Sequence, residues 1–296
     1  MRFRCSAASR DDGEPLAGSA PSDVRWLLLE RPGAWLPKAA ESLELPAALT
    51  DPARAGVWAD ARVQLVRRPG GGRTPDGLVA FRADLAAGTL ERAVVSTLDD
   101  VADAAWAPWP RPLWLVCAHG RRDVCCAELG RPVAARLAAS DPAATWETSH
   151  LGGHRFAPTL LALPSGVVLG RLDGGGSADA EAAAAVDALR AGRWPDAAVL
   201  RGRAGRPAAV QAAEAHVLAA RPGLPLAAVE GRIVQAPGAG GGVVVEVRTP
   251  DGAERLLVEP ETRERRQSCA EERLKPATSW RVRGPAPIAP AAGGSQ

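Results

Sequence analysis

Two cysteines and two histidines are spaced so that together they could bind a metal centre. Eight residues separate Cys117 from Cys126, and three separate His150 from His154. Cys117 ends an apolar segment, Cys126 precedes a helical pattern, and the histidines flank Leu-Gly-Gly. Thiolates and neutral imidazoles are common ligands of zinc and of iron–sulfur clusters. The set therefore predicts metal or redox chemistry.

The residues themselves leave three interpretations open. Zinc prefers tetrahedral Cys₂His₂ sites and the histidine spacing suits it, but the cysteine spacing is wider than the usual gap of about two to four residues. An iron–sulfur cluster tolerates wider spacing because two irons spread the ligands apart. In the third interpretation the thiols are buried and the histidines are structural. We favour a shared site because both pairs lie in glycine-containing loops, which let the backbone approach an inorganic core.

The elements that must position these residues form a strand–helix–strand unit followed by a hairpin and a helix. The apolar and helical patterns predict strands at 112–118 and 145–150, a hairpin at 159–172, and helices at 127–139 and 178–192. A similar order precedes them: strands at 24–30 and 62–66, a helix within 49–61, two strands within 77–95 and a helix at 98–106. Both halves fit a thioredoxin-like unit, which predicts an internal duplication.

We therefore expect an α/β (α+β) fold in four parts. Residues 1–106 form a thioredoxin-like half without cluster ligands, and residues 107–194 form the thioredoxin-like domain that carries them. Residues 195–284 form a small C-terminal α+β appendage, with a helix at 207–220 and a hairpin that turns at Pro-Asp-Gly. Residues 285–296 form a disordered tail.

Composition excludes several classes of protein. The 36 basic and 34 acidic residues are scattered, so no nucleic-acid partner is expected. No segment approaches about 20 apolar residues and the start lacks a secretion signal, so we expect a cytoplasmic protein without a membrane span. Thiols stay reduced there, and five cysteines do not indicate a disulfide framework. Cys5, Cys269 and His216 are interpreted as structural.

Two segments resemble the sucrase/ferredoxin-like family, which is associated with thioredoxin-like [2Fe-2S] ferredoxins. These are CAHGRRDVCCAELG at 117–130 and WETSHLGGHRFAPTLLALPSG at 146–166. The family pattern C-x-H-x(2)-R-D-x(2)-C is matched by Cys117, His119, Arg122, Asp123 and Cys126. This alignment favours Cys126 over Cys125 as a ligand.

The resemblance implies a [2Fe-2S] cluster with Cys117 and Cys126 on one iron and His150 and His154 on the other. Neutral imidazoles in place of thiolates raise the reduction potential, as in Rieske centres at about −150 to +300 mV against about −400 mV for plant-type ferredoxins. Imidazole ligands that titrate would make the midpoint pH-dependent. The implied function is that of an electron carrier or oxidoreductase component.

A flavoprotein or other reductase is the expected electron donor, because no G-x-G-x-x-G motif lies between a strand and a helix. The acceptor is not identified. Arg155 could stabilise a reduced cluster, guide a partner or simply be solvated. His119 could support the cluster, replace a ligand or be an ordinary loop residue.

Two other functions remain open: a zinc-stabilised binding module, and a thiol-dependent redox enzyme that uses Cys125 or Cys126. The absence of a C-x-x-C motif weakens the second. No recognisable carboxylate pair supports glycoside hydrolysis, so no hydrolase site is predicted.

Overall fold

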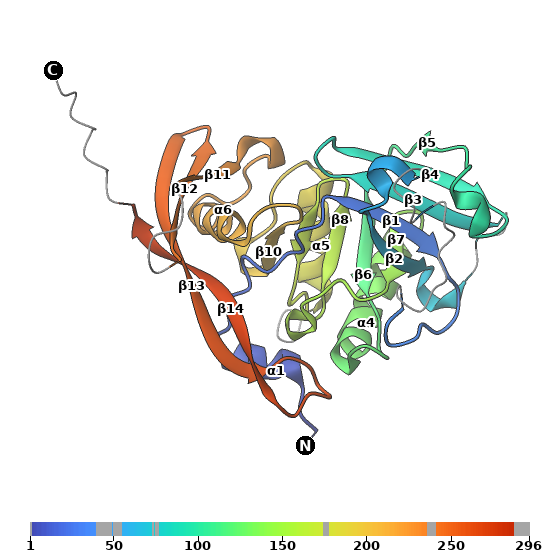
Figure 1. Cartoon of the computed structure of the whole chain (residues 1–296), viewed down its shortest axis with the longest axis horizontal. Coiled ribbons are helices and arrows are strands. Elements are labelled where there is room, and N and C mark those ends of the chain that lie inside the picture. Colours follow the sequence, from blue (N-terminus) through green and yellow to red (C-terminus); the bar gives the residue numbers. More distant parts are fainter. Residues whose placement is uncertain are drawn as a thin grey trace.

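The computed structural model describes residues 2–39, 49, 55–72, 74, 77–173, 178–235 and 241–286. Figure 1 shows a large curled sheet with helices packed on it and a second sheet at the C-terminal side. The first sheet has ten strands in the order β10-β9-β8-β6-β7-β2-β1-β3-β4-β5, and the second has the order β11-β12-β13-β14. The mixed α/β class expected from the sequence is confirmed.

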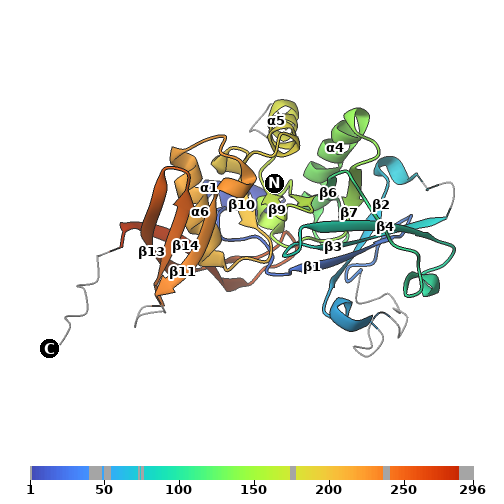
Figure 2. The ribbon, with the colours of Figure 1, turned by 90° about the horizontal axis from the view of Figure 1, so that it is seen from above.

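The half that carries the cysteine and histidine pairs is built around one fully buried strand. Its elements are β6 (Leu113–Cys117), α4 (Val124–Ser140), β7 (Thr145–Thr148), β8 (Leu160–Leu163), β9 (Val167–Leu169) and α5 (Ala178–Arg190). All five residues of β6 are buried, as in a central strand covered on both faces. β7 pairs parallel to it, β8 pairs antiparallel on its other side, and β9 continues from β8. α4 and α5 lie on the same face of these strands (Figure 2).

The N-terminal half repeats this strand order. Its strands are β1 (Arg25–Glu30), β2 (Arg62–Arg67), β3 (Leu78–Asp84), β4 (Thr89–Val95) and β5 (Ala107–Pro108). β2 is parallel to β1, β3 is antiparallel on the other side of β1, and β4 continues from β3. The halves join where β2 pairs antiparallel with β7. The division into separate domains stays a prediction.

Two expected helices of this half differ from the structure or lie partly outside it. At 98–106 only the 3₁₀ helix η3 (Asp99–Val101) forms. Such a short segment cannot propagate an α-helix by itself, and Asp100 instead accepts hydrogen bonds from Thr97. Of the helix expected within 49–61, residues 50–54 lie outside the described residues, and Gly56–Trp58 form the 3₁₀ helix η1.

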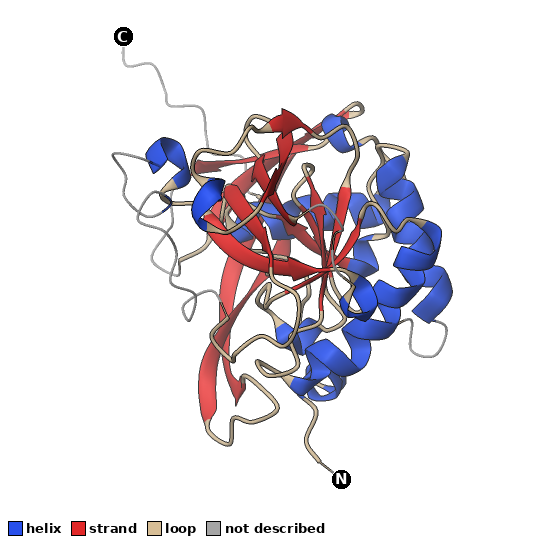
Figure 3. Cartoon of the chain, turned by 90° about the vertical axis from the view of Figure 1, so that its right-hand side faces the viewer, coloured by secondary structure: helices blue, strands red, loops and turns tan. Residues whose placement is uncertain are grey.

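The C-terminal part shares a core with the preceding half. Its elements are β10 (Leu200–Arg203), α6 (Ala208–Ala220), β11 (Glu230–Gln235), β12 (Val243–Thr249), β13 (Gly252–Arg266) and β14 (Leu274–Pro285). β10 pairs with β9 and so extends the large sheet. Apolar side chains of α6, β12 and β13 pack in one cluster with those of β6, β8 and α5. Figure 3 shows the longer helices gathered on one side of the strands.

The last strand and the first helix, like β5 and β10, were not expected from the sequence. β14 pairs with β13, and its cross-strand pairs include polar ones such as Thr262 with Thr278. Because its residues do not alternate between apolar and polar, the sequence did not predict a strand there. The short helix α1 (Cys5–Asp11) lies beside the ends of β13 and β14 (Figure 1). Residues 287–296 of the predicted tail lie outside the described residues.

Within the part of the chain that the structure describes, no helix is long and apolar enough to cross a membrane.

Candidate metal centre

Cys117 and Cys126 lie where the last residue of β6 meets the first turn of α4. Each residue is 1% exposed. Asp123 caps α4 by accepting a hydrogen bond from the Cys125 backbone amide at 2.9 Å. Gly130 lets α4 pack directly on the end of β6, because a Cβ atom there would overlap the Cys117 carbonyl oxygen. Helix capping and close packing thus bring the two thiols together.

His150 and His154 flank a turn that requires glycine. Gly152 and Gly153 have φ of +88° and +69°, a region that disfavours residues with a side chain. The turn leads from β7 into the 3₁₀ helix η4 (His154–Phe156). The two imidazole rings stack with centroids 4.9 Å apart and planes 28° apart. The turn therefore places both rings on the same side of the loop.

The histidine pair meets the cysteine pair through His150. Its Nδ1 lies 3.9 Å from the Cys117 sulfur and 3.8 Å from the Cys126 sulfur. One ligand atom from each of these three residues lies within 4.8 Å of the others. The structure thus brings three of the four predicted ligands into one cluster.

His154 lies at the outer side of that cluster. Its Nδ1 is 3.2 Å from the Nε2 of His150, while its Nε2 contacts the backbone carbonyl of Gln267. A carbonyl partner on one nitrogen fixes the ring orientation, as it does for metal-binding histidines, while the other nitrogen of His154 faces the His150 ring rather than the two thiols. Burial and the neighbouring His150 lower the pKa of His154 to about 4, so its ring is neutral near pH 7.

The two thiols have opposite pKa shifts. The hydrogen bond from Cys126 lowers the pKa of Cys117 well below its ordinary value, and His150 and the His119 backbone amide lower it further. The same hydrogen bond, together with burial, raises the pKa of Cys126. The pair therefore favours ionisation of Cys117 over Cys126, and a bound cation would displace the protons of both thiols.

A buried arginine that the sequence analysis missed supports the histidine loop. Arg201 in β10 is 1% exposed and donates hydrogen bonds of 3.0 Å to the Gly152 carbonyl and to the Ser19 hydroxyl. Burial lowers its pKa to about 9, so it remains mostly protonated at pH 7, and it interacts electrostatically with Cys117 and Cys126. A positive charge thus lies beneath the site.

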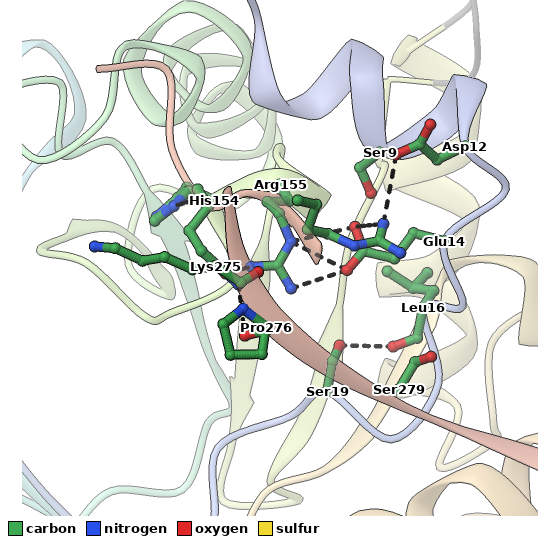
Figure 4. A network of polar contacts seen from close by, with 12 residues as sticks. Ser9, Asp12, Glu14, Leu16, Ser19, His154, Arg155, Lys275, Pro276 and Ser279 are labelled. Atoms are coloured by element: carbon green, nitrogen blue, oxygen red, sulfur yellow. Dashed lines mark hydrogen bonds and ion pairs between the residues drawn. The ribbon is translucent and has the colours of Figure 1, made fainter. Parts of the chain in front are cut away.

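The other residues singled out in the sequence have different partners. The Nε2 of His119 lies 2.8 Å from the Leu36 carbonyl, so its ring does not join the cysteine cluster. Arg155 donates to Glu14 at 2.9 Å and contacts Gln267, as Figure 4 shows for the Glu14 pair. It is therefore paired rather than simply solvated.

The Cys125 sulfur lies 3.8 Å from the Cys5 sulfur and 3.2 Å from the Cys269 sulfur, and Cys125 is not part of the His150 group. Ligand atoms of these cysteines and of Asp123 form a second group within 4.8 Å of one another. The structural role expected of Cys5 and Cys269 from the sequence did not include a contact between them. The four side chains come from three segments that are far apart in the sequence, so residue spacing could not predict the group. In the sequence, only the presence of cysteines without an assigned role pointed to it.

The geometry can be compared with known proteins. No curated protein and no solved structure matches the chain. The sucrase/ferredoxin-like family matches residues 16–176, more than half of the chain and a segment that includes both the cysteine pair and the histidine pair. The chain therefore belongs to the sucrase/ferredoxin-like family.

Proposed function

We propose that the chain is an electron-transfer protein that holds a [2Fe-2S] cluster on Cys117, Cys126, His150 and His154. The observation that carries the proposal is the convergence of two buried thiols with a stacked histidine pair. The Nδ1 of His150 faces both thiols, and the Nδ1 of His154 faces the His150 ring. The strand order β9-β8-β6-β7 around this site supports a thioredoxin-like domain, and β4-β3-β1-β2 supports its degenerate repeat.

The surrounding residues suit a group that accepts negative charge. A bound [2Fe-2S] cluster would take up and release one electron at a time. The His119 amide supports a thiolate at Cys117, and the buried Arg201 opposes the added negative charge. Two imidazoles in place of two thiolates make the ligand set less negative. Together these features favour a potential above that of an all-cysteine cluster.

An electron partner can approach the site from the side of His150. A cavity of about 410 Å³ there is lined by His150, His119, Lys38, Arg62 and Arg122. Lys38 and Arg122 are exposed. A surface with acidic side chains would complement this edge and speed the encounter. We therefore propose an acidic docking face on the reductase that supplies electrons.

A zinc-stabilised binding module is the alternative, because two cysteines and two histidines also suit tetrahedral zinc and the His150 Nδ1 lies 3.8 to 3.9 Å from both sulfurs, as around a single ion. Metal analysis separates the two. The full chain is purified without oxygen, and iron, zinc and acid-labile sulfide are measured beside the absorption spectrum. We expect about two irons and two sulfides per chain, with sulfur-to-iron absorption bands.

Matched serine variants assign the cysteine ligand. Cys126→Ser should lose iron and sulfide, whereas Cys125→Ser should retain both, because the Cys125 sulfur faces Cys5 and Cys269 instead. A wild-type protein that contains zinc but no iron or sulfide would contradict the cluster. If Cys126→Ser then loses zinc, the result favours the zinc module.

A further inference from the structure

A second group of metal-binding side chains joins three segments that are far apart in the sequence. Cys5 comes from α1, Asp123 and Cys125 from the start of α4, and Cys269 from the loop between β13 and β14. Cys5 and Cys125 are each 1% exposed, and Asp123 is 4% exposed. Cys5 and Cys269 lie outside the part of the chain that the family matches.

The sulfur atoms form a compact triangle. The Cys125 and Cys269 sulfurs are 3.2 Å apart, Cys269 and Cys5 3.5 Å, and Cys5 and Cys125 3.8 Å. Both carboxylate oxygens of Asp123 lie 3.6 Å from the Cys5 sulfur. The Zn–S distance of about 2.3 Å and Zn–O of about 2.0 Å place tetrahedral ligands about 3.8 Å (S to S) and 3.5 Å (S to O) apart. The group is therefore close to the size of one tetrahedral site.

The backbone already holds the carboxylate toward the thiols. Asp123 accepts hydrogen bonds from the backbone amides of Cys125 at 2.9 Å and Cys269 at 2.8 Å. These bonds leave lone pairs on both oxygens, because a carboxylate has about four acceptor sites. The backbone thus holds a buried, hydrogen-bonded carboxylate next to three thiols. It is the arrangement expected of a preformed ligand set.

A disulfide explains this group less well than a cation does. A disulfide would join two of the three sulfurs and leave the third thiol facing the carboxylate. The three separations, 3.2, 3.5 and 3.8 Å, are similar and do not set one pair apart as disulfide partners. A tetrahedral cation would use all four side chains at once.

We infer that Cys5, Cys125, Cys269 and Asp123 form a structural site for one Zn²⁺ ion, separate from the proposed cluster. Each thiol that binds releases its proton as it becomes a thiolate. The full ligand set would leave the site with net negative charge. Arg4, which pairs with Glu128 at 2.7 Å, also interacts electrostatically with Cys125 and Cys269.

Such a site would lock the β13–β14 loop over the cluster ligands. Gln267, two residues before Cys269, contacts His154 through its carbonyl and Arg155 through its side chain. A cation at Cys269 would hold this loop against α1 and α4. The zinc would thus fix the orientation of His154 without contacting it.

Metal content tests the inference on the full chain. Cells are supplied with zinc and iron, the protein is purified without chelators or oxygen, and zinc, iron and sulfide are measured in one sample. We expect about one zinc per chain in the wild type. Cys5→Ser and Cys269→Ser should lower zinc to background while iron and sulfide stay bound. The matched control Cys117→Ser should lose iron and sulfide but retain its zinc.

Three results would overturn the inference. The first is wild-type protein that binds no zinc even after incubation of the reduced chain with Zn²⁺ alone. The second is zinc that stays in Cys5→Ser and Cys269→Ser, since it would then be bound elsewhere. The third is a disulfide among Cys5, Cys125 and Cys269, found by mass spectrometry after alkylation in denaturant. None of these requires the cluster, so a protein with zinc but without iron would refute only the proposed function.

Discussion

The turn between the two histidines offers a sharp test of how the site is held, through the substitution Gly153→Ala. A Cβ atom at Gly153 would lie 2.7 Å from the Cζ of Arg201, well inside van der Waals contact. Arg201 cannot move away easily, because it is 1% exposed and donates hydrogen bonds to Gly152 and Ser19. The new methyl group must therefore displace either the loop or the arginine.

Gly152→Ala is the matched control that separates backbone strain from crowding. Both glycines have positive φ, so either alanine costs about 1–2 kcal/mol for the left-handed conformation. A Cβ at Gly152 would have no neighbour within 4 Å. Crowding against Arg201 adds about 1–3 kcal/mol at Gly153 alone. We therefore expect a total loss of about 2–5 kcal/mol for Gly153→Ala.

Urea unfolding of both variants, in the same reduced and metal-free state, measures the difference. A common metal state is needed because a ligand that binds only the folded chain adds to its stability. We also expect lower iron content in Gly153→Ala than in Gly152→Ala, because His154 follows the crowded residue. Equal unfolding free energies and equal iron contents would show that Arg201 does not support the loop.

Three further predictions concern charge. Burial raises the pKa of Glu14, but hydrogen bonds from Arg155 and the nearby Arg265 outweigh it and lower the pKa overall. The resulting stability is complete above the ordinary pKa of about 4.3 and is lost as the pH falls through the lower folded value. The stability gap between the wild type and Glu14→Gln should therefore shrink below about pH 4.3 in urea unfolding, and a constant gap would contradict this. Arg201→Gln should lower the cluster midpoint in a redox titration, because reduction adds negative charge near the removed cation; an unchanged midpoint would count against that role. The wild-type midpoint should fall by up to about 59 mV per pH unit where an imidazole ligand loses its proton, and a flat profile would argue against histidine ligation.

The sequence predicted the strands and helix that carry the main site because their patterns are local. Cys117 ends a buried strand, Cys126 lies in the first turn of a helix, and the glycine turn between the histidines is visible in the residue order. These features depend on spacing and backbone preference, which a single chain displays directly.

Contacts that depend on tertiary packing could not be predicted. Cys5 and Cys269 are 264 positions apart in the sequence. Their contact depends on β14, which the sequence does not predict as a strand because many of its cross-strand pairs with β13 are polar. Arg201 looks like an ordinary surface arginine in the sequence, but β10 extends the large sheet and buries it beneath the histidine loop. Only the folded sheet brings these residues to the site.

The central claim is a [2Fe-2S] cluster with two histidine ligands, and EPR of the dithionite-reduced chain tests it most directly. The wild type should give the signal of one reduced cluster. His150→Cys and His154→Cys should each shift the g-values and lower the midpoint, because a thiolate replaces a neutral imidazole. A wild type without a signal, or variants whose spectra and midpoints equal those of the wild type, would contradict the account.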